Sequence, residues 1–264
     1  MKSRYAIEVS KYGKKDGIAA ICVFLGYVIL SNGFALVLGM IPLTGTVRSL
    51  VTVAWLALLA VGVLIIVKAS KQKLSSIGFQ KENIGKAIGL ALLFCLLPIV
   101  FVAVIPGILH GFVDRVDFFP LVFTLLTTFI YAAHEDIIFV GFIQTRLYGF
   151  FKSNFIAILV GALLFSLMHL PPWIAMGRLD ISQPLEILLQ IIRWAFIHVV
   201  FVAIFKKYFS IVPIFILHTI NNLSHEFSRS DMNLANIMII LYLLAACFLY
   251  WHTYKADKKL SLSE

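Results

Sequence analysis

Long apolar runs, separated by short polar stretches, divide the sequence from its first helix-length segment to its last. A membrane-spanning helix needs about 20 apolar residues, whereas a spanning strand alternates apolar and polar positions over about ten. Because the runs do not alternate, they predict helices that cross a bilayer. We predict eight such helices, over residues 18–41, 49–67, 86–109, 118–147, 153–170, 185–205, 209–225 and 234–254.

The composition supports this interpretation. Of the 264 residues, 61% are hydrophobic and 13% are charged, whereas a soluble domain has about 45–50% apolar and 25% charged residues. A water-soluble enzyme, a disordered chain and a disulfide scaffold are therefore excluded, and irregular or open-edged backbone cannot span hydrocarbon. We expect an all-α, polytopic membrane helical bundle that forms a single membrane domain over residues 1–264, with the lipid bilayer as its surroundings.

The net charge of +9 could indicate a nucleic-acid partner, but in a chain this apolar a basic excess is typical of cytoplasmic loops. We place the N-terminus in the cytoplasm. Of the 22 lysines and arginines, one lies inside the sixth run (Arg193) and four lie in outside loops (Arg48, Arg115, Arg178 and Arg229). The rest lie on the cytoplasmic side. Both termini are therefore predicted to be cytoplasmic, in a cell membrane that we take to be a bacterial plasma membrane.

The stretch 68–86 carries Leu74, Ile77, Phe79 and Ile84 among lysines. This pattern is consistent with an amphipathic linker on the cytoplasmic membrane surface. A solvated connector is the alternative.

Ionisable and amide side chains are rare inside the predicted spans, and such groups are expensive in a bilayer and usually functional. They occur in four of the spans, namely His134, Glu135 and Asp136 in the fourth, His169 in the fifth, Glu186, Arg193 and His198 in the sixth, and His218, Asn221, Asn222 and His225 in the seventh. We interpret Glu186, Gln190 and Arg193 as a self-satisfied polar face; in the alternative, Arg193 contacts a substrate carboxylate.

Three of these helices bring polar groups to similar depths. At about 1.5 Å per residue, Glu135, His169, His218 and Asn222 lie roughly 16, 22, 12 and 18 Å from the cytoplasmic edge. His218 and Asn222 share one helix face, and Glu135 is expected in an apolar wall that favours a general base. One shared site is predicted; the alternative is a set of polar groups that bridge helices.

The residues around Glu135 match the zinc-protease motif only in part. His134 and Glu135 begin an HExxH pattern, but Ile138 stands where the second histidine is required. A zinc ion held by Glu135, His169 and His218 is chemically feasible. Because the nearby Asn222 suits an oxyanion donor better than a zinc ligand, we expect no cofactor, and zinc is kept as the alternative.

The residues resemble a known family. The segment Glu135–Gly141 is similar to EExxxR followed by glycine, the first motif of the CAAX protease and bacteriocin-processing family, also called CPBP or Abi. Phe165–His169 matches its FxxxH motif and His218–Asn222 its HxxxN motif, in the family's order, within a core of about residues 118–225. Ser76–Phe79 resembles the family's lead-in.

The resemblance implies an intramembrane endopeptidase of about eight helices. It implies that Glu135 activates water, that His169 helps to hold that water, and that His218 and Asn222 form an oxyanion hole, with Asp136 as the second acidic residue. The implied substrate is a membrane-associated peptide or protein, in pheromone or bacteriocin maturation, self-immunity or CAAX-like processing. Some members have been described as metalloproteases, so a metal is the implied alternative.

Two positions depart from the family pattern. The second glutamate is Asp136, and the motif arginine is Val140. If that arginine pairs with the second carboxylate, Asp136 lacks its partner here, and Arg146 and Arg193 are candidate substitutes. The departure favours an alternative function, a catalytically silent relative that binds and regulates a membrane partner such as a sensor kinase. A transporter would show inverted repeats, which we do not find.

Overall fold

The computed structural model describes residues 3–112, 118–227 and 232–261. Arg115 and Arg229, which we assigned to outside loops, therefore lie outside the described residues. Helices account for the whole architecture of the described part. They are α1 (Arg4–Val9), α2 (Lys14–Gly39), α3 (Gly45–Ala69), η1 (Leu74–Ile77), α4 (Ile84–Pro98), η2 (Ile99–Val104), α5 (Ile105–His110), α6 (Phe118–Glu135), η3 (Asp136–Ile143), α7 (Gln144–Phe151), α8 (Asn154–Ala175), α9 (Pro184–Tyr208), α10 (Val212–Ser224) and α11 (Met232–Ser261).

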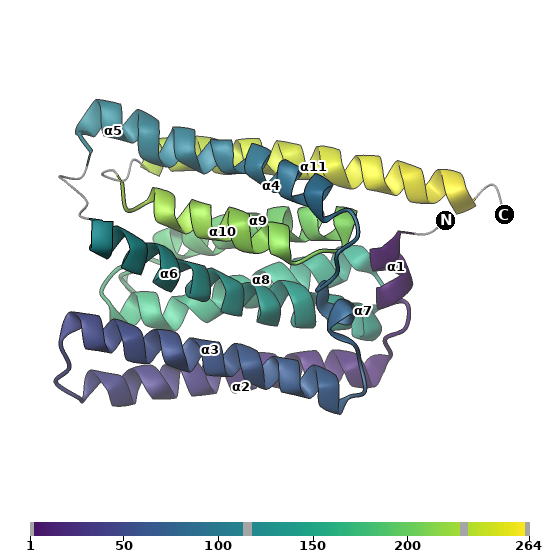
Figure 1. Cartoon of the computed structure of the whole chain (residues 1–264), viewed down its shortest axis with the longest axis horizontal. Coiled ribbons are helices and arrows are strands. Elements are labelled where there is room, and N and C mark those ends of the chain that lie inside the picture. The colour runs from purple at the N-terminus through teal and green to yellow at the C-terminus, as the bar shows by residue number, and fades with distance from the viewer. Residues whose placement is uncertain (1–2, 113–117, 228–231, 262–264) are drawn as a thin grey trace.

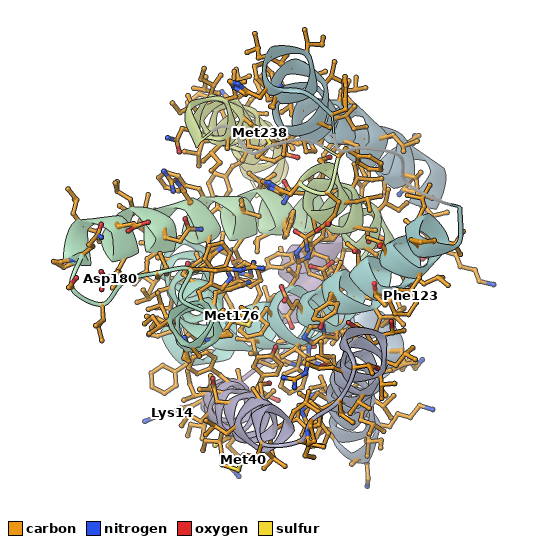
Figure 2. The ribbon with its side chains drawn as sticks, turned by 90° about the vertical axis from the view of Figure 1, so that its left-hand side faces the viewer. Lys14, Met40, Phe123, Met176, Asp180 and Met238 are labelled. Carbon is orange, nitrogen blue, oxygen red and sulfur yellow. The ribbon has the colours of Figure 1, made fainter. Side chains whose placement is uncertain are left out.

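Within the described residues, seven helical segments are long and apolar enough to cross a membrane. They are Lys14–Gly39, Gly45–Ala69, Ile84–His110, Pro120–Phe151, Asn154–Ala175, Pro184–Tyr208 and Leu234–Trp251. The predicted all-α membrane bundle is thus confirmed, and the chain is a multi-pass membrane protein. The outward side chains are largely carbon (Figure 2), and many large apolar residues are exposed, as a surface in contact with lipid requires.

The predicted span 209–225 is helical but short. Its helix, α10, has 13 residues and a length of about 20 Å, less than the hydrocarbon thickness of about 30 Å. It packs against α4, α6 and α9, and most of its residues are buried. Protein rather than lipid therefore surrounds most of this helix, which explains why its sequence is as apolar as that of a full span.

The helices run alternately up and down the bundle (Figure 1). The α2–α3 hairpin lies along one side, α4, α5 and α11 lie along the other, and α6, α8, α9 and α10 fill the middle. The helix α1 and the end of α11 lie at the same end of the bundle, which we call the α1 end. The prediction that this end faces the cytoplasm stays a prediction.

Two of the long helices contain a π-helical stretch. In the third span, η2 directly follows Pro98. A proline has no backbone N–H and clashes with the carbonyl of the preceding turn. The wider π turn absorbs this disturbance, so the helix continues without a break. In the fourth span, η3 covers Asp136–Ile143 and includes no proline.

The middle of the 68–86 linker is buried in the bundle, whereas Lys71, Lys73 and Lys81 are exposed. Ile77 and Gly78 are buried at the α1 end, and the Gly78 carbonyl accepts a hydrogen bond of 3.0 Å from the Ile211 amide. Gly78 has a φ of 91°, and a Cβ atom there would collide with the Phe205 ring. Glycine is required at this position both for its backbone conformation and for the close approach to α9.

Candidate active site

The first motif lies where α6 passes into the π turn. Glu135 is the last residue of α6, and Asp136 is the first of η3. All eight residues of η3 are buried. Sequence spacing assumed a regular helix, in which Ile138, Phe139 and Phe142 share the face of Glu135. The π turn widens the helix at this point, and such turns are frequent at functional sites.

Glu135 faces two histidines from two other helices. Its Oε2 atom lies 3.7 Å from Nε2 of His169 on α8 and 3.7 Å from Nε2 of His218 on α10. Both distances are too long for a direct hydrogen bond, and Oε2 is buried without any hydrogen-bond partner in the described part of the chain. The three atoms therefore converge without bonding to one another, as they would around a water molecule or a substrate atom.

The ring of His169 is fixed from two sides. Its Nδ1 atom lies 2.8 Å from the Phe165 carbonyl oxygen. Because a carbonyl can only accept, Nδ1 carries the hydrogen and donates it, which leaves Nε2 directed at Glu135. The ring also stacks on Trp194 of α9, with centroids 4.7 Å apart and planes at 24°. Both contacts hold the Nε2 edge towards the carboxylate.

Asp136 orients the second histidine. Its Oδ1 atom lies 3.0 Å from Nδ1 of His218, and the aspartate side chain is completely buried. The carboxylate accepts the Nδ1 hydrogen, so Nε2 of His218 points at Glu135. Each of the two consecutive acidic residues keeps one buried oxygen without a hydrogen-bond partner in the described chain, Oε2 of Glu135 and Oδ2 of Asp136. They differ because Asp136 also holds a ring in place through Oδ1.

The two arginines considered as partners of Asp136 lie elsewhere. Arg193 donates from Nε to Asn236 Oδ1 of α11 at 2.9 Å and from Nη1 to Gln190 at 3.1 Å. Among the ion pairs of the described residues, Asp136 pairs with His218 alone. The inference that Asp136 lacks a partner was therefore wrong, because it treated an arginine as the necessary counterpart and a histidine fills that role.

Arg146 is completely enclosed, although sequence placed it at the membrane edge. Only 1% of it is exposed. Its guanidinium donates to the Thr145 hydroxyl at 2.6 Å, the Ser76 hydroxyl at 3.0 Å and the Gly141 carbonyl at 3.3 Å, and also to Gln72. It lies between the rings of Tyr12 and Phe142, 4.6 and 4.5 Å from their centroids. Arg146 thereby fastens the linker to α7.

Asn222 lies one turn after His218 on α10 and is half-buried. Its Oδ1 atom is 3.4 Å from Nδ2 of the buried Asn221. Within the described residues, no hydrogen bond joins Asn222 to Glu135 or to either histidine. His225, which sequence placed on the same stripe, is exposed at the helix end. The stripe therefore contributes His218 directly to the convergence, with Asn222 one turn away.

Other polar residues near this point come from outside the three motifs. Tyr27 of α2 lies with its hydroxyl 3.0 Å from Nε2 of His134, and the two rings stack. Tyr27 stands in an apolar run, and no sequence pattern distinguishes it from a packing aromatic. His198 of α9 is fully buried and stacks on Phe165. Its rarity as an intramembrane histidine made it visible in the sequence, although its contacts were not.

Glu135, His169 and His218 are the donors that the zinc alternative requires. In the part of the chain that the structure describes, no group of three or more His, Cys, Asp and Glu side chains is arranged to hold a metal ion. Glu135, His169 and His218 do supply suitable donor atoms, but their 3.7 Å separations exceed the spacing of about 3.3 Å between neighbouring ligands of a tetrahedral zinc with bonds of ~2.0–2.1 Å. In this arrangement the carboxylate oxygen lies farther from the two histidine nitrogens than it would around a bound zinc.

The region that carries these residues is similar to a known protein family. Residues 117–224 match the family model described as type II CAAX prenyl endopeptidase Rce1-like. No curated protein and no solved structure matches the chain. The matched segment runs from α6 to α10 and contains Glu135, His169 and His218. This segment is therefore similar to the type II CAAX prenyl endopeptidases, which confirms the resemblance predicted from the three motifs and indicates the fold of a membrane protease, a hydrolase.

Proposed function

We propose that the chain is an intramembrane endopeptidase in which Glu135 is the general base that activates water. The observation that carries this proposal is the convergence of Glu135 Oε2 with Nε2 of His169 and Nε2 of His218, each 3.7 Å away. A base must have a free lone pair within reach of a water molecule. Glu135 Oε2 is buried and lacks a hydrogen-bond partner within the described chain, so it meets that requirement.

The reaction we propose is a hydrolysis in two steps. Glu135 takes a proton from a water held beside His169, and the resulting hydroxide attacks the carbonyl carbon of the scissile peptide bond. The carbonyl oxygen becomes an oxyanion, which His218 and Asn222 stabilise by donating hydrogen bonds. Collapse of this intermediate breaks the C–N bond, and the proton held by Glu135 passes to the leaving amine.

Asp136 has a separate role in this proposal. To donate from Nε2 while Nδ1 donates to Asp136, His218 must carry both protons, and the adjacent carboxylate stabilises that charged ring. A buried aspartate that fixes a histidine ring in this way governs its orientation and its protonation together. We therefore propose Glu135, Asp136, His169, His218 and Asn222 as the site, within a catalytic core of about residues 118–225.

The substrate we propose is a peptide or protein associated with the membrane. The site lies inside a bundle of spans, so a substrate reaches it from the lipid or from a membrane face. In a bacterial plasma membrane, maturation of a pheromone or bacteriocin, self-immunity or CAAX-like processing would supply such a substrate. The match to prenyl endopeptidases supports the CAAX-like class among these.

The test is cleavage of a candidate membrane peptide by the purified protein in liposomes, with mass spectrometry to identify the new termini. Glu135→Gln keeps the shape of the side chain but cannot accept the proton, so turnover should fall by about 10²–10⁴-fold. Glu186→Gln is the matched control, because Glu186 is an exposed glutamate on α9. Equal activity of wild type and Glu135→Gln would refute Glu135 as the base.

A second candidate function is favoured by one observation. Val140 occupies the position of the motif arginine and is completely buried, and both terminal nitrogens of the Arg146 guanidinium donate to residues other than Asp136. A chain without that arginine could be a catalytically silent relative that binds and regulates a membrane partner such as a sensor kinase. In that case the cellular phenotype would survive Glu135→Gln, whereas substitutions on a partner-binding surface would abolish it.

A further inference from the structure

Three buried polar side chains outside the motifs form a group beside the proposed site. They are Tyr5 of α1, Gln144 of α7 and His198 of α9, each at most 1% exposed. His198 Nε2 lies 3.3 Å from Gln144 Oε1. The Tyr5 ring makes an edge contact with Phe205 of α9, with centroids 6.1 Å apart, and α1 packs against both α7 and α9.

Each member of this group retains a polar atom without a partner. The Tyr5 hydroxyl, Gln144 Nε2 and His198 Nδ1 are all buried, and none has a hydrogen-bond partner within the described residues. Buried polar atoms in native proteins are nearly always paired, and where protein does not pair them an internal water with two to four polar neighbours commonly does. Unpartnered atoms on three residues of helices that pack together are consistent with a buried water at this group.

The neighbouring helix leaves room at this group. Gly161 of α8 faces it, and a Cβ atom at Gly161 would collide with Gln144 Oε1 and lie 3.4 Å from His198 Nε2. Any larger residue at this position would displace the Gln144 side chain. The glycine thus preserves the polar group inside an otherwise apolar helix contact.

The group lies between the α1 end of the bundle and the proposed site. Tyr5 belongs to α1, which lies at that end (Figure 1). The His198 ring stacks on Phe165 with centroids 4.9 Å apart. The same phenyl ring makes edge contacts with His169 and His218, whose ring centroids lie 4.8 and 6.5 Å from its own. One phenyl ring therefore separates the polar group from the two histidines that face Glu135.

We propose that Tyr5, Gln144 and His198 form an internal water site that supplies Glu135 with hydrolytic water from the α1 end of the bundle. This inference rests on the proposed function, because each peptide bond hydrolysed consumes one water and lipid surrounds the bundle. The occupant is water itself, and the three residues position it rather than take part in the chemistry.

Water at this site can be detected without any substrate. X-ray hydroxyl-radical labelling of the full chain in nanodiscs, followed by mass spectrometry, modifies side chains that adjoin bound water. Tyr242 is the internal control, because it is as buried as Tyr5 but its hydroxyl donates to the Phe94 carbonyl at 3.3 Å. We expect Tyr5 to be labelled well above Tyr242. Labelling of Tyr5 no higher than that of Tyr242 would overturn the water site.

Variants test whether this water serves the reaction. Gln144→Leu should reduce Tyr5 labelling to the level of Tyr242 and lower kcat by about tenfold, the change expected when a hydrogen bond to the water is lost. Ser224→Ala is the control, because it removes a buried hydroxyl that donates within α10 and lies outside the group; it should retain both properties, and its failure to do so would show that Gln144→Leu acts through general damage to the fold. Loss of labelling in Gln144→Leu with kcat unchanged would overturn the supply role.

The two proposals can fail separately. A wild-type protein that is labelled at Tyr5 but cleaves no peptide would overturn the proposed function and the supply role, and the water site would stand. A wild-type protein that cleaves a peptide but is not labelled at Tyr5 would overturn the water site alone.

Discussion

Glu135 and Arg146 lie in one continuous helical segment, and both are charged groups withdrawn from water, but their surroundings differ. Arg146 donates from both terminal guanidinium nitrogens to hydroxyl, amide and carbonyl oxygens of three segments and lies between two rings; only its Nε lacks a hydrogen-bond partner within the described residues, and that atom does not face the site. Glu135 has a buried oxygen without a hydrogen-bond partner in the described chain and two imidazoles at 3.7 Å. Burial of a charge alone therefore does not identify a site; unused bonding capacity that faces other reactive groups does.

This comparison predicts two kinds of defect. Substitutions around Glu135 should remove activity and leave the folded state intact, since few of the structural contacts depend on them. Substitutions at Arg146 should weaken the attachment of the linker to α7 and leave the chemistry of the folded fraction nearly unchanged.

The largest effects beyond Glu135 itself are expected at the two proposed oxyanion donors. His218→Ala and Asn222→Ala should each lower kcat by about 10²–10³-fold, because each removes a donor aimed at the developing negative charge. His225→Ala is the matched control, since His225 lies at the end of the same helix and is exposed. Initial rates in liposomes measure the effect, and a full-rate Asn222→Ala variant would remove Asn222 from the site.

Asp136→Asn should have an intermediate effect. The motif arginine is absent here, but the Asp136 carboxylate holds His218 at 3.0 Å. An amide cannot stabilise the charged ring and permits it to turn, and misplacement of a catalytic group by about 1 Å can cost 10²-fold in rate. The NMR signals of the His218 ring nitrogens should change together with kcat. A rate close to wild type would show that Asp136 is peripheral after all.

Arg146→Met should show the opposite pattern. It leaves the acceptors of Gln72, Ser76 and Thr145 without their donor, and each buried group left unsatisfied costs about 1–3 kcal/mol of stability. Thermal unfolding in detergent should shift to lower temperature, with kcat per folded molecule within a few-fold of wild type. Lys73→Met serves as a control at an exposed position of the same linker. A stable Arg146→Met protein without activity would contradict the comparison.

The smallest effect is expected from chelators. Glu135, His169 and His218 do not form a metal-binding group in the described structure, and the proposed reaction uses protein side chains alone. Activity should therefore survive dialysis against a strong chelator. Loss of a stoichiometric zinc together with activity, and recovery of both on addition of zinc, would move the mechanism to metal-activated water.

Sequence alone predicts the membrane bundle because the length of an apolar run maps directly onto the thickness of a bilayer. Seven of the eight predicted spans correspond to helices of the described chain that are long enough to cross a membrane. The short α10 was harder to recognise, because a helix buried in protein and a helix buried in lipid are equally apolar. The burial of the linker was missed for a different reason, since it depends on contacts remote in sequence, of Ile77 with η3 and of Gly78 with α9.

Motif order and depth predicted that α6, α8 and α10 bring Glu135, His169 and His218 together, and the structure places these residues in contact range. The π turn at Asp136 was not predictable, since no proline marks it. The pairing of Asp136 with His218 depends on this turn and on the rotation of α10, which spacing along one helix does not determine. The cytoplasmic location of both termini stays a prediction.

The comparison of Glu135→Gln with a deletion strain, at matched protein level, tests the central claim most directly. If Glu135 is the base, the variant should accumulate and fold like the wild type and reproduce the deletion phenotype in full, because proton abstraction is the one property it loses. A wild-type phenotype from Glu135→Gln would contradict the protease mechanism and favour a silent relative that acts through binding.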